Sequence, residues 1–290
     1  MPSATLEDEF ETVKALLGRP AAPAEHDVEL SASAPADLLD RIAEALDGRA
    51  PHVVIDCRDF NHENLPKLLA AAKARLAMPC PNYPRLWFRR LEVGLVVIER
   101  RIDETSQIAY TKAFKEAARK IIARPAASKR STQGLVALLS QVGPRIALMG
   151  AIGVWLFERR FPSLYEFYKW YGHRDRPGPR HVPESRLGEL NNWAHPAGEH
   201  GIPKRRNRDR QLIEAMLADI RHAYSRGRLA KHDWYRCVIL LKHSRTRAGA
   251  VFRERLRSEL AELERLGVAP PPLLVVADGR TPGTDRGDDE

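Results

Sequence analysis

The residues best suited to chemistry lie in the stretch 28–46, where a short apolar start leads into an eight-residue loop and an amphipathic helix. This layout holds a nucleotide triphosphate when the loop has two glycines and ends in Lys followed by Ser or Thr. Here Ser31 and Ala36 stand at the glycine positions, Asp37 at the lysine position and Leu38 at the hydroxyl position. The stretch is therefore either a phosphate-binding loop that has lost its chemistry or an ordinary strand, turn and helix.

A second and a third strand end would complete a nucleotide site. The apolar run 237–241 should end in an acidic residue that holds Mg²⁺ through water, yet it leads into Lys242 and Arg245, both cationic. The run 273–277 ends at Asp278, in the place of a polar residue that senses the γ-phosphate. Asp37 carries the wrong charge for phosphate and Lys242 the wrong charge for Mg²⁺, which favours a site that no longer binds nucleotide.

Other polar clusters are weaker candidates. Asp59 and His62 follow an apolar strand and could form an acid–base pair, although an ion pair in a loop is the favoured interpretation. The histidines of the stretch 173–200 lack the i, i+4 spacing of a helical metal site, so no metal is expected. The aromatic residues 165–171 could stack on single-stranded bases, but core packing is favoured.

Positive charge is concentrated in one part of the chain. Residues 204–247 hold thirteen Lys and Arg against four Asp and Glu, an excess equal to the +9 of the whole chain. Such a stripe could attract nucleic acid, anionic lipid or an acidic protein, and the alternative is a solvated surface. The candidate contacts to nucleic acid are Lys204, Arg205, Arg206, Arg208, Arg210, Arg226 and Arg228.

Composition indicates a globular protein. The 290 residues are 43% hydrophobic and 29% charged, and three cysteines without CxxC spacing argue against disulfides or structural zinc. No signal peptide is recognisable, so the cytoplasm is the expected compartment. The apolar run 146–157 is shorter than the roughly 20 residues that span a bilayer, which favours a buried helix or an interfacial segment over a membrane span and leaves peripheral membrane contact open.

The order of elements predicts a three-layer α/β fold with a parallel sheet. Residues 1–27 should form a helix and a linker, 28–278 the α/β domain with a mainly helical insertion at about 100–207, and 279–290 a disordered tail. Strands are predicted at 28–30, 52–57, 90–99, 237–241 and 273–277. Helices are predicted at 38–46, 65–76, 105–123, 135–157, 211–226 and 248–266, and residues 172–207 should form a long loop with short helices.

Residues 28–278 resemble the nucleotide-binding core of actinobacterial P-loop NTPases of the STAND/AAA+ type. The resemblance rests on the stretches 52–60, 170–175, 237–249 and 274–277. It implies a P-loop NTPase-like sheet that would bind ATP or GTP with Mg²⁺. The chain departs from the family at the Walker A and Walker B positions, so that activity cannot be carried over.

The predicted function is therefore a non-catalytic pseudo-NTPase module that acts as a scaffold or a regulatory partner. Its partner would be an active NTPase homologue or another copy of itself, and no cofactor is expected. One alternative is a nucleic-acid-binding protein that uses the basic stripe. The second alternative is an NTPase with relocated catalytic groups that still binds ATP and Mg²⁺, and Asp37 and Lys242 make it the weakest of the three.

Overall fold

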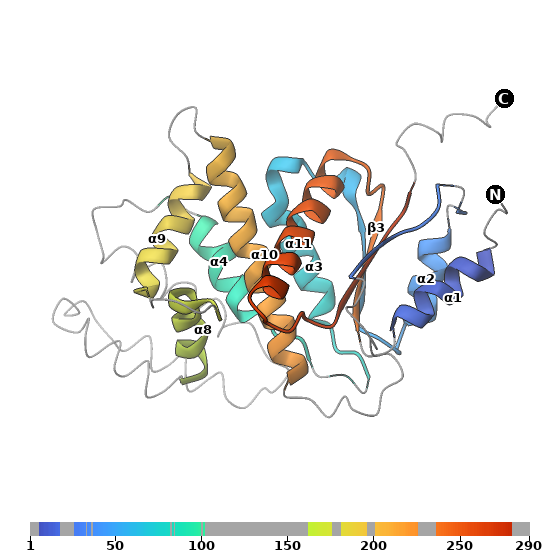
Figure 1. Ribbon diagram of the computed structural model, residues 1–290, viewed down its shortest axis with the longest axis horizontal. Helices are drawn as coiled ribbons and strands as arrows, with labels where there is room; N and C mark the ends of the chain where they lie inside the picture. The colour runs from blue at the N-terminus through green and yellow to red at the C-terminus, as the bar shows by residue number, and fades with distance from the viewer. Residues whose placement is uncertain are drawn as a thin grey trace, which may run out of the picture. The chain divides into compact units, whose positions relative to one another are not determined.

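The computed structural model divides the chain into two compact units, which are described one at a time (Figure 1). The first comprises Met1–Phe88 with Asp209–Glu290, and the second comprises Arg89–Arg208. The structure describes residues 6–17, 26–32, 34–35, 37–81, 83, 85–99, 101, 162–175, 181–195, 201–225 and 236–279.

The first unit is built on a parallel sheet whose four described strands are ordered β1-β4-β3-β2. Alternating strands and helices require parallel pairing, as the sequence predicted. Four of the five predicted strands are present in the described residues. They are β1 (Asp27–Glu29), β2 (His52–Asp56), β3 (Cys237–Lys242) and β4 (Leu273–Ala277).

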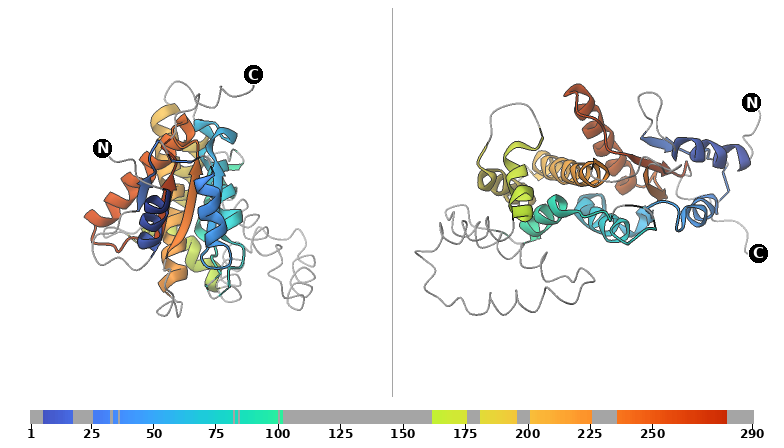
Figure 2. Two further views of the ribbon diagram at one scale, coloured as in Figure 1. Left: turned by 90° about the vertical axis from the view of Figure 1, so that its right-hand side faces the viewer. Right: turned by 90° about the horizontal axis from the view of Figure 1, so that it is seen from below.

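Helices cover both faces of this sheet, which gives three layers (Figures 1 and 2). One face carries α1 (Leu6–Leu17) and α2 (Leu38–Leu46), whose apolar side chains pack on alternate residues of β3 and β4. The other face carries α3 (Leu65–Leu76) and α11 (Arg247–Arg265). Every residue of β4 is buried, as expected of a central parallel strand covered on both sides.

Short connections position the polar ends of the strands. Two 3₁₀ turns, η1 (Cys57–Asp59) and η2 (His62–Asn64), follow β2 and lead into α3. The Thr246 hydroxyl caps α11 by accepting a hydrogen bond from the Gly249 N–H. A side chain at residue 249 would lie 2.3 Å from the Ser244 carbonyl oxygen, so only glycine allows this close turn between β3 and α11.

The second unit is helical and corrects one strand prediction. The stretch 90–99 was predicted as a strand because of its β-branched run, but it forms helix α4 (Arg89–Glu99). Its buried residues recur at helical spacing, and the Asn191 amide donates to the Val97 carbonyl at 2.6 Å. Packing against α8 (Pro162–His173) and α9 (Pro183–Ala194) therefore outweighs the local β preference. The helical unit consequently begins at Arg89.

The region 172–207 is more helical than predicted. Besides α9, it contains the first residues of α10 (Gly201–Ser225), which begins ten residues before the helix predicted at 211. The run of charged residues at the start of α10 hid its helical pattern. Residues 201–208 belong to the second unit and 209–225 to the first.

Several predictions fall outside the described residues. These are the linker at 18–25, the helices at 105–123 and 135–157, the apolar run 146–157, and the tail beyond Gly279. Within the described residues, no helix has the length and apolar character needed to cross a bilayer.

Candidate functional site

The loop between β1 and α2 is folded in on itself. The Ala34 N–H donates to the Ser31 carbonyl at 3.0 Å, and the Leu38 N–H donates to the Pro35 carbonyl at 3.2 Å. A working phosphate loop instead directs its N–H groups toward the anion. Leu38, at the position of the Mg²⁺-binding hydroxyl, is only 1% exposed and belongs to the core against β3 and β4. Asp37 is exposed, and Ala36 lies outside the described residues.

The end of β4 presses against this loop. The Leu30 N–H donates to the Ala277 carbonyl at 2.8 Å and continues the pairing of β1 with β4. A Cβ atom on Gly279 would lie 2.2 Å from the Leu30 carbonyl oxygen and 3.0 Å from the Ala32 nitrogen. Backbone thus packs directly on backbone at this place, and no phosphate-sized space is left between Gly279 and residues 30–32.

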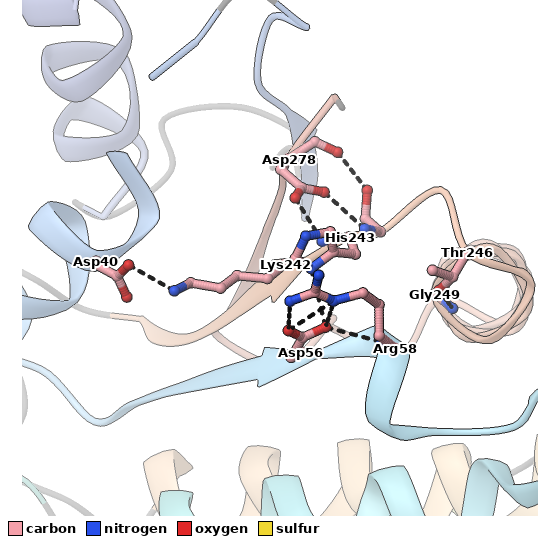
Figure 3. Close-up of polar contacts among 9 residues, drawn as sticks. Asp40, Asp56, Arg58, Lys242, His243, Thr246, Gly249 and Asp278 are labelled. Carbon is pink, nitrogen blue, oxygen red and sulfur yellow. Dashed lines mark hydrogen bonds and ion pairs between the residues drawn. The ribbon is translucent and has the colours of Figure 1, made fainter. Parts of the chain in front are cut away.

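Lys242 lies at the carboxyl end of β3, where the sequence placed the lost acidic residue. Its ammonium nitrogen is 2.6 Å from an oxygen of Asp40, in the first turn of α2 (Figure 3). At the strand end where a nucleotide-binding fold would have an acidic residue, the structure therefore has a Lys–Asp ion pair. Sequence reasoning missed Asp40, because nothing in its local pattern indicates a partner 202 residues away.

Asp278, at the end of β4, holds the turn after β3 in place (Figure 3). Its carboxylate accepts hydrogen bonds from the backbone N–H groups of His243 at 2.5 Å and Ser244 at 2.7 Å. The Ser244 hydroxyl donates to the Asp278 carbonyl at 2.5 Å. His243 is in the left-handed region, with φ +52°. Asp278 is thus the polar strand-end residue that the sequence predicted, but its carboxylate is committed to the protein's own backbone.

A third cluster lies at the end of β2, around Asp56. The Arg58 side chain donates to both carboxylate oxygens at 2.8–3.2 Å, and His243 Nδ1 lies 3.0 Å from Asp56 Oδ1 (Figure 3). The Arg58 hydrogen bond is the main reason that the pKa of Asp56 falls to about 2. The favoured interpretation of a loop ion pair is confirmed for this region, but it joins Asp56 to Arg58 rather than Asp59 to His62.

Arg245 points away from the Asp56 cluster, toward β1 at the other outer edge of the sheet. Its guanidinium nitrogens lie 3.1–3.2 Å from Glu29 Oε1. Arg253 of α11 donates to both Asp27 and Glu29, and the side chains of Arg253 and Asp27 are only 8% and 5% exposed. Burial alone would raise the pKa of Glu29, but the hydrogen bonds from Arg253 and Arg245 lower it. A hollow of about 410 Å³ beside this cluster is lined by Glu29, Ser244, Arg245, Ala250, Arg253, Glu254 and Arg257.

The buried cysteines Cys57 and Cys237 are not poised as nucleophiles. Burial raises the pKa of both Cys57 and Cys237 to about 12, so these thiols stay protonated. In the part of the chain that the structure describes, no three His, Cys, Asp or Glu side chains are grouped as metal ligands.

Some side chains of the basic stripe form ion pairs within the chain or are buried. Arg210 forms an ion pair with the buried Glu259, and Arg208 is 8% exposed. Lys204, Arg205 and Arg206 are partly or largely exposed on α10 in the second unit, whereas Arg226 and Arg228 lie outside the described residues. The structure therefore does not unite the stripe into one described surface.

The aromatic cluster packs in the core, as favoured from the sequence. Tyr168, Trp170 and Tyr171 are at most 8% exposed. The Trp170 indole N–H donates to Asp175 at 2.9 Å, and the Tyr171 hydroxyl donates to the Arg90 carbonyl at 2.6 Å. These three rings are therefore not available for stacking on bases.

Comparison with family models, with characterised proteins and with solved structures gives no match. The residues predicted for a nucleotide site do not form one in the structure. Ser31 and Asp37 are exposed, and Leu38 is buried in the core. Lys242, Arg245 and Asp278 are bonded to other parts of the chain.

Proposed function

We propose that the chain is a non-catalytic module of P-loop NTPase-like fold that acts as a scaffold or regulatory partner, as its resemblance to STAND/AAA+ proteins implies. The strand order places the ends of β1, β4 and β3 side by side, where a nucleotide site would be assembled. The observation that carries the proposal is that the protein's own groups occupy the carboxyl ends of these strands. Asp278 bonds the β3 turn, Lys242 is paired with Asp40, and Leu38 is in the core.

The carboxylates at the N-terminus of α2 would repel a triphosphate bound at the carboxyl ends of the strands. The N-terminus of α2 would ordinarily attract an anion, but Asp37 occupies its cap position and Asp40 its first turn. Near a protein surface, two like unit charges about 4 Å apart repel by about 4 kcal/mol. Because Asp40 already neutralises Lys242, the ammonium brings no net attraction to offset this repulsion.

Nucleotide binding tests the proposal directly. Thermal unfolding is measured with Mg·ATP and with Mg·GTP at millimolar concentration, with the nucleotide-free protein and an intact P-loop NTPase as references. Ligand that binds only the folded state must raise the melting temperature. We expect no rise for this chain, and a rise of several degrees would overturn the proposal.

A designed gain of binding sharpens the result. Replacing Asp37 and Asp40 together (Asp37→Asn with Asp40→Asn) removes both carboxylates and frees the Lys242 ammonium. We expect weak, salt-sensitive binding of inorganic triphosphate to the freed ammonium, without hydrolysis, because residues 31–38 still lack the lysine and the hydroxyl that hold phosphate and Mg²⁺. The matched control is Asp47→Asn, which removes an exposed carboxylate just after the other end of α2.

Binding of nucleic acid by the basic stripe remains a prediction that no observation favours over the scaffold. A generic duplex at low salt tests it, because contacts to phosphate weaken steeply as salt rises. Absence of binding at low salt would remove this alternative.

A further inference from the structure

β2 is an outer strand of the described sheet, and an apolar side chain at its centre is exposed. β2 is the last strand on its side, and β3 is its one neighbour in the described sheet. Val54, at its centre, is 36% exposed, and Met78, in the segment that follows α3, is 57% exposed. An uncovered apolar edge of this kind is a template for pairing with a further strand.

The backbone of β2 defines which groups are available. The Val238 N–H donates to the Pro51 carbonyl at 2.9 Å, and Val238 is in register with His52. In a parallel pair, alternate residues direct both backbone groups toward the same neighbour. The odd-numbered residues of β2 therefore face β3, and the N–H and C=O groups of His52, Val54 and Asp56 point outward.

We propose that a second copy of this chain pairs with this edge, β2 against β2 in antiparallel orientation, with the two-fold axis at Val54. A symmetric contact needs a patch that is complementary to itself. Antiparallel pairing about the middle residue is the register that overlaps all five residues of the strand. It brings the outward backbone groups of each His52 opposite those of the partner's Asp56.

The side chains of β2 suit this register. On one face Val54 meets its own copy, and His52 lies opposite the partner's Asp56, a carboxylate ionised at neutral pH because its pKa is about 2. On the other face Val53 lies opposite the partner's Ile55, and both are apolar and buried within their own unit. Like charges thus never face each other across the two strands, a juxtaposition that would destabilise an antiparallel pair.

A groove beside β2 leaves room for the partner. It has a volume of about 410 Å³ and lies between the strand and the segments that follow α2 and α3. Gly48, His52, Val54, Met78 and Pro79 are among its lining residues. One short strand and one groove form a small interface, so we expect a reversible dimer with a dissociation constant on the order of 10 µM.

This inference rests on the proposed scaffold function, because it names the partner as the chain itself. Nucleotide binding and self-association are separate measurements, so either can fail alone. Sedimentation velocity of the full chain, from about 1 µM to about 0.5 mM, should show a monomer converting to a dimer. A chain that stays monomeric throughout this range would overturn the inference, as would assembly into higher oligomers without a dimer.

The register is tested by a charge swap at the two-fold axis. Val54→Lys and Val54→Glu should each weaken the dimer at least tenfold, because each places like charges opposite each other. Mixing the two variants should restore a dimer, now with opposite charges at the axis. Val182→Lys is the matched control, since Val182 is 60% exposed and lies outside β2. A dimer that persists in either single variant, or a mixture that stays monomeric, would contradict the inference.

Amide exchange in the wild-type chain gives a readout that needs no variant. The Val54 amide should exchange more slowly as protein concentration rises through the dissociation constant. The Val28 amide, on the strand at the other side of the sheet, should not change. Equal behaviour of the two amides would also overturn the inference.

Discussion

The two outer strands of the sheet, β1 and β2, differ in how their edges are protected against pairing with a further strand. β1 is three residues long, and its two carboxylates, Asp27 and Glu29, are held by arginines of α11 and the turn before it. β2 is five residues long and has Val54 exposed at its centre. Charge and short length discourage pairing at an edge, whereas an apolar edge invites it. One edge of this sheet is therefore closed by ion pairs, and the other is suited to recognition.

The carboxyl ends of the strands add a second lesson. The charged residues at these strand ends are not free, because Lys242, Asp278 and Asp56 are each bonded to other parts of the chain. The charges at the carboxyl ends of the strands are thus neutralised within the chain. A buried or half-buried charge without a partner would have destabilised the fold.

The largest expected effect comes from breaking the ion pairs of Arg253 with β1. Arg253→Met removes the guanidinium between β1 and α11 and leaves the buried Asp27 carboxylate with a weaker set of partners. Breaking a buried ion pair on one side typically costs about 3 kcal/mol or more. Urea denaturation should show a loss of that size in the free energy of unfolding. Arg265→Met, which removes a 68% exposed arginine, should leave it almost unchanged.

A smaller loss is expected where β4 presses on the loop after β1. Gly279→Ala forces a methyl group against the Leu30 carbonyl, and overpacking of this kind costs about 2 kcal/mol. Gly48→Ala, beside the start of β2, meets no atom within 4 Å and pays only for its positive φ, about 1 kcal/mol. If both variants lose equal stability, the close packing of Gly279 on the loop would be contradicted. Thermal unfolding followed by circular dichroism gives the comparison.

Acid should loosen the end of β2 through Asp56. The pKa of Asp56 lies below its ordinary value, at about 2, chiefly because Arg58 donates to the carboxylate. A lowered pKa in the folded state gives stability that is present above about pH 4 and lost as the pH falls toward 2. Asp56→Asn should therefore cost stability at neutral pH, and the difference from wild type should shrink on acidification. A constant difference between pH 7 and pH 2 would refute the assignment.

The smallest expected effect on folding is at the open edge itself. Val54→Lys should change the free energy of unfolding of the monomer by about 0.5 kcal/mol or less, because the side chain is 36% exposed and a lysine ammonium at this position reaches solvent. Val28→Lys on β1 should cost more, since Val28 is partly buried against the core under α1 and α2. The pair separates an edge that is needed for folding from one that is not. Chemical denaturation at low protein concentration makes this comparison without interference from association.

Local pattern predicted much of the framework. Strands β2, β3 and β4 were read from β-branched or apolar runs, and the apolar faces of α2, α3 and α11 were read from helical spacing. The stretch 90–99 shows the limit, because the same kind of apolar run became helix α4 where helices rather than strands surround it. A short apolar run is compatible with both structures until its neighbours are known.

The sequence by itself determined that residues 31–38 lack the glycines, lysine and hydroxyl of a phosphate-binding loop, because residue type alone decides this. Tertiary structure decided which groups the charged strand-end residues contact. The contacts of Lys242 with Asp40 and of His243 with Asp56 join residues 202 and 187 positions apart. Strand order likewise decided which strands form the outer edges. Charge and apolar spacing act locally along the chain, whereas pairing across a parallel sheet depends on which distant segments the fold brings together.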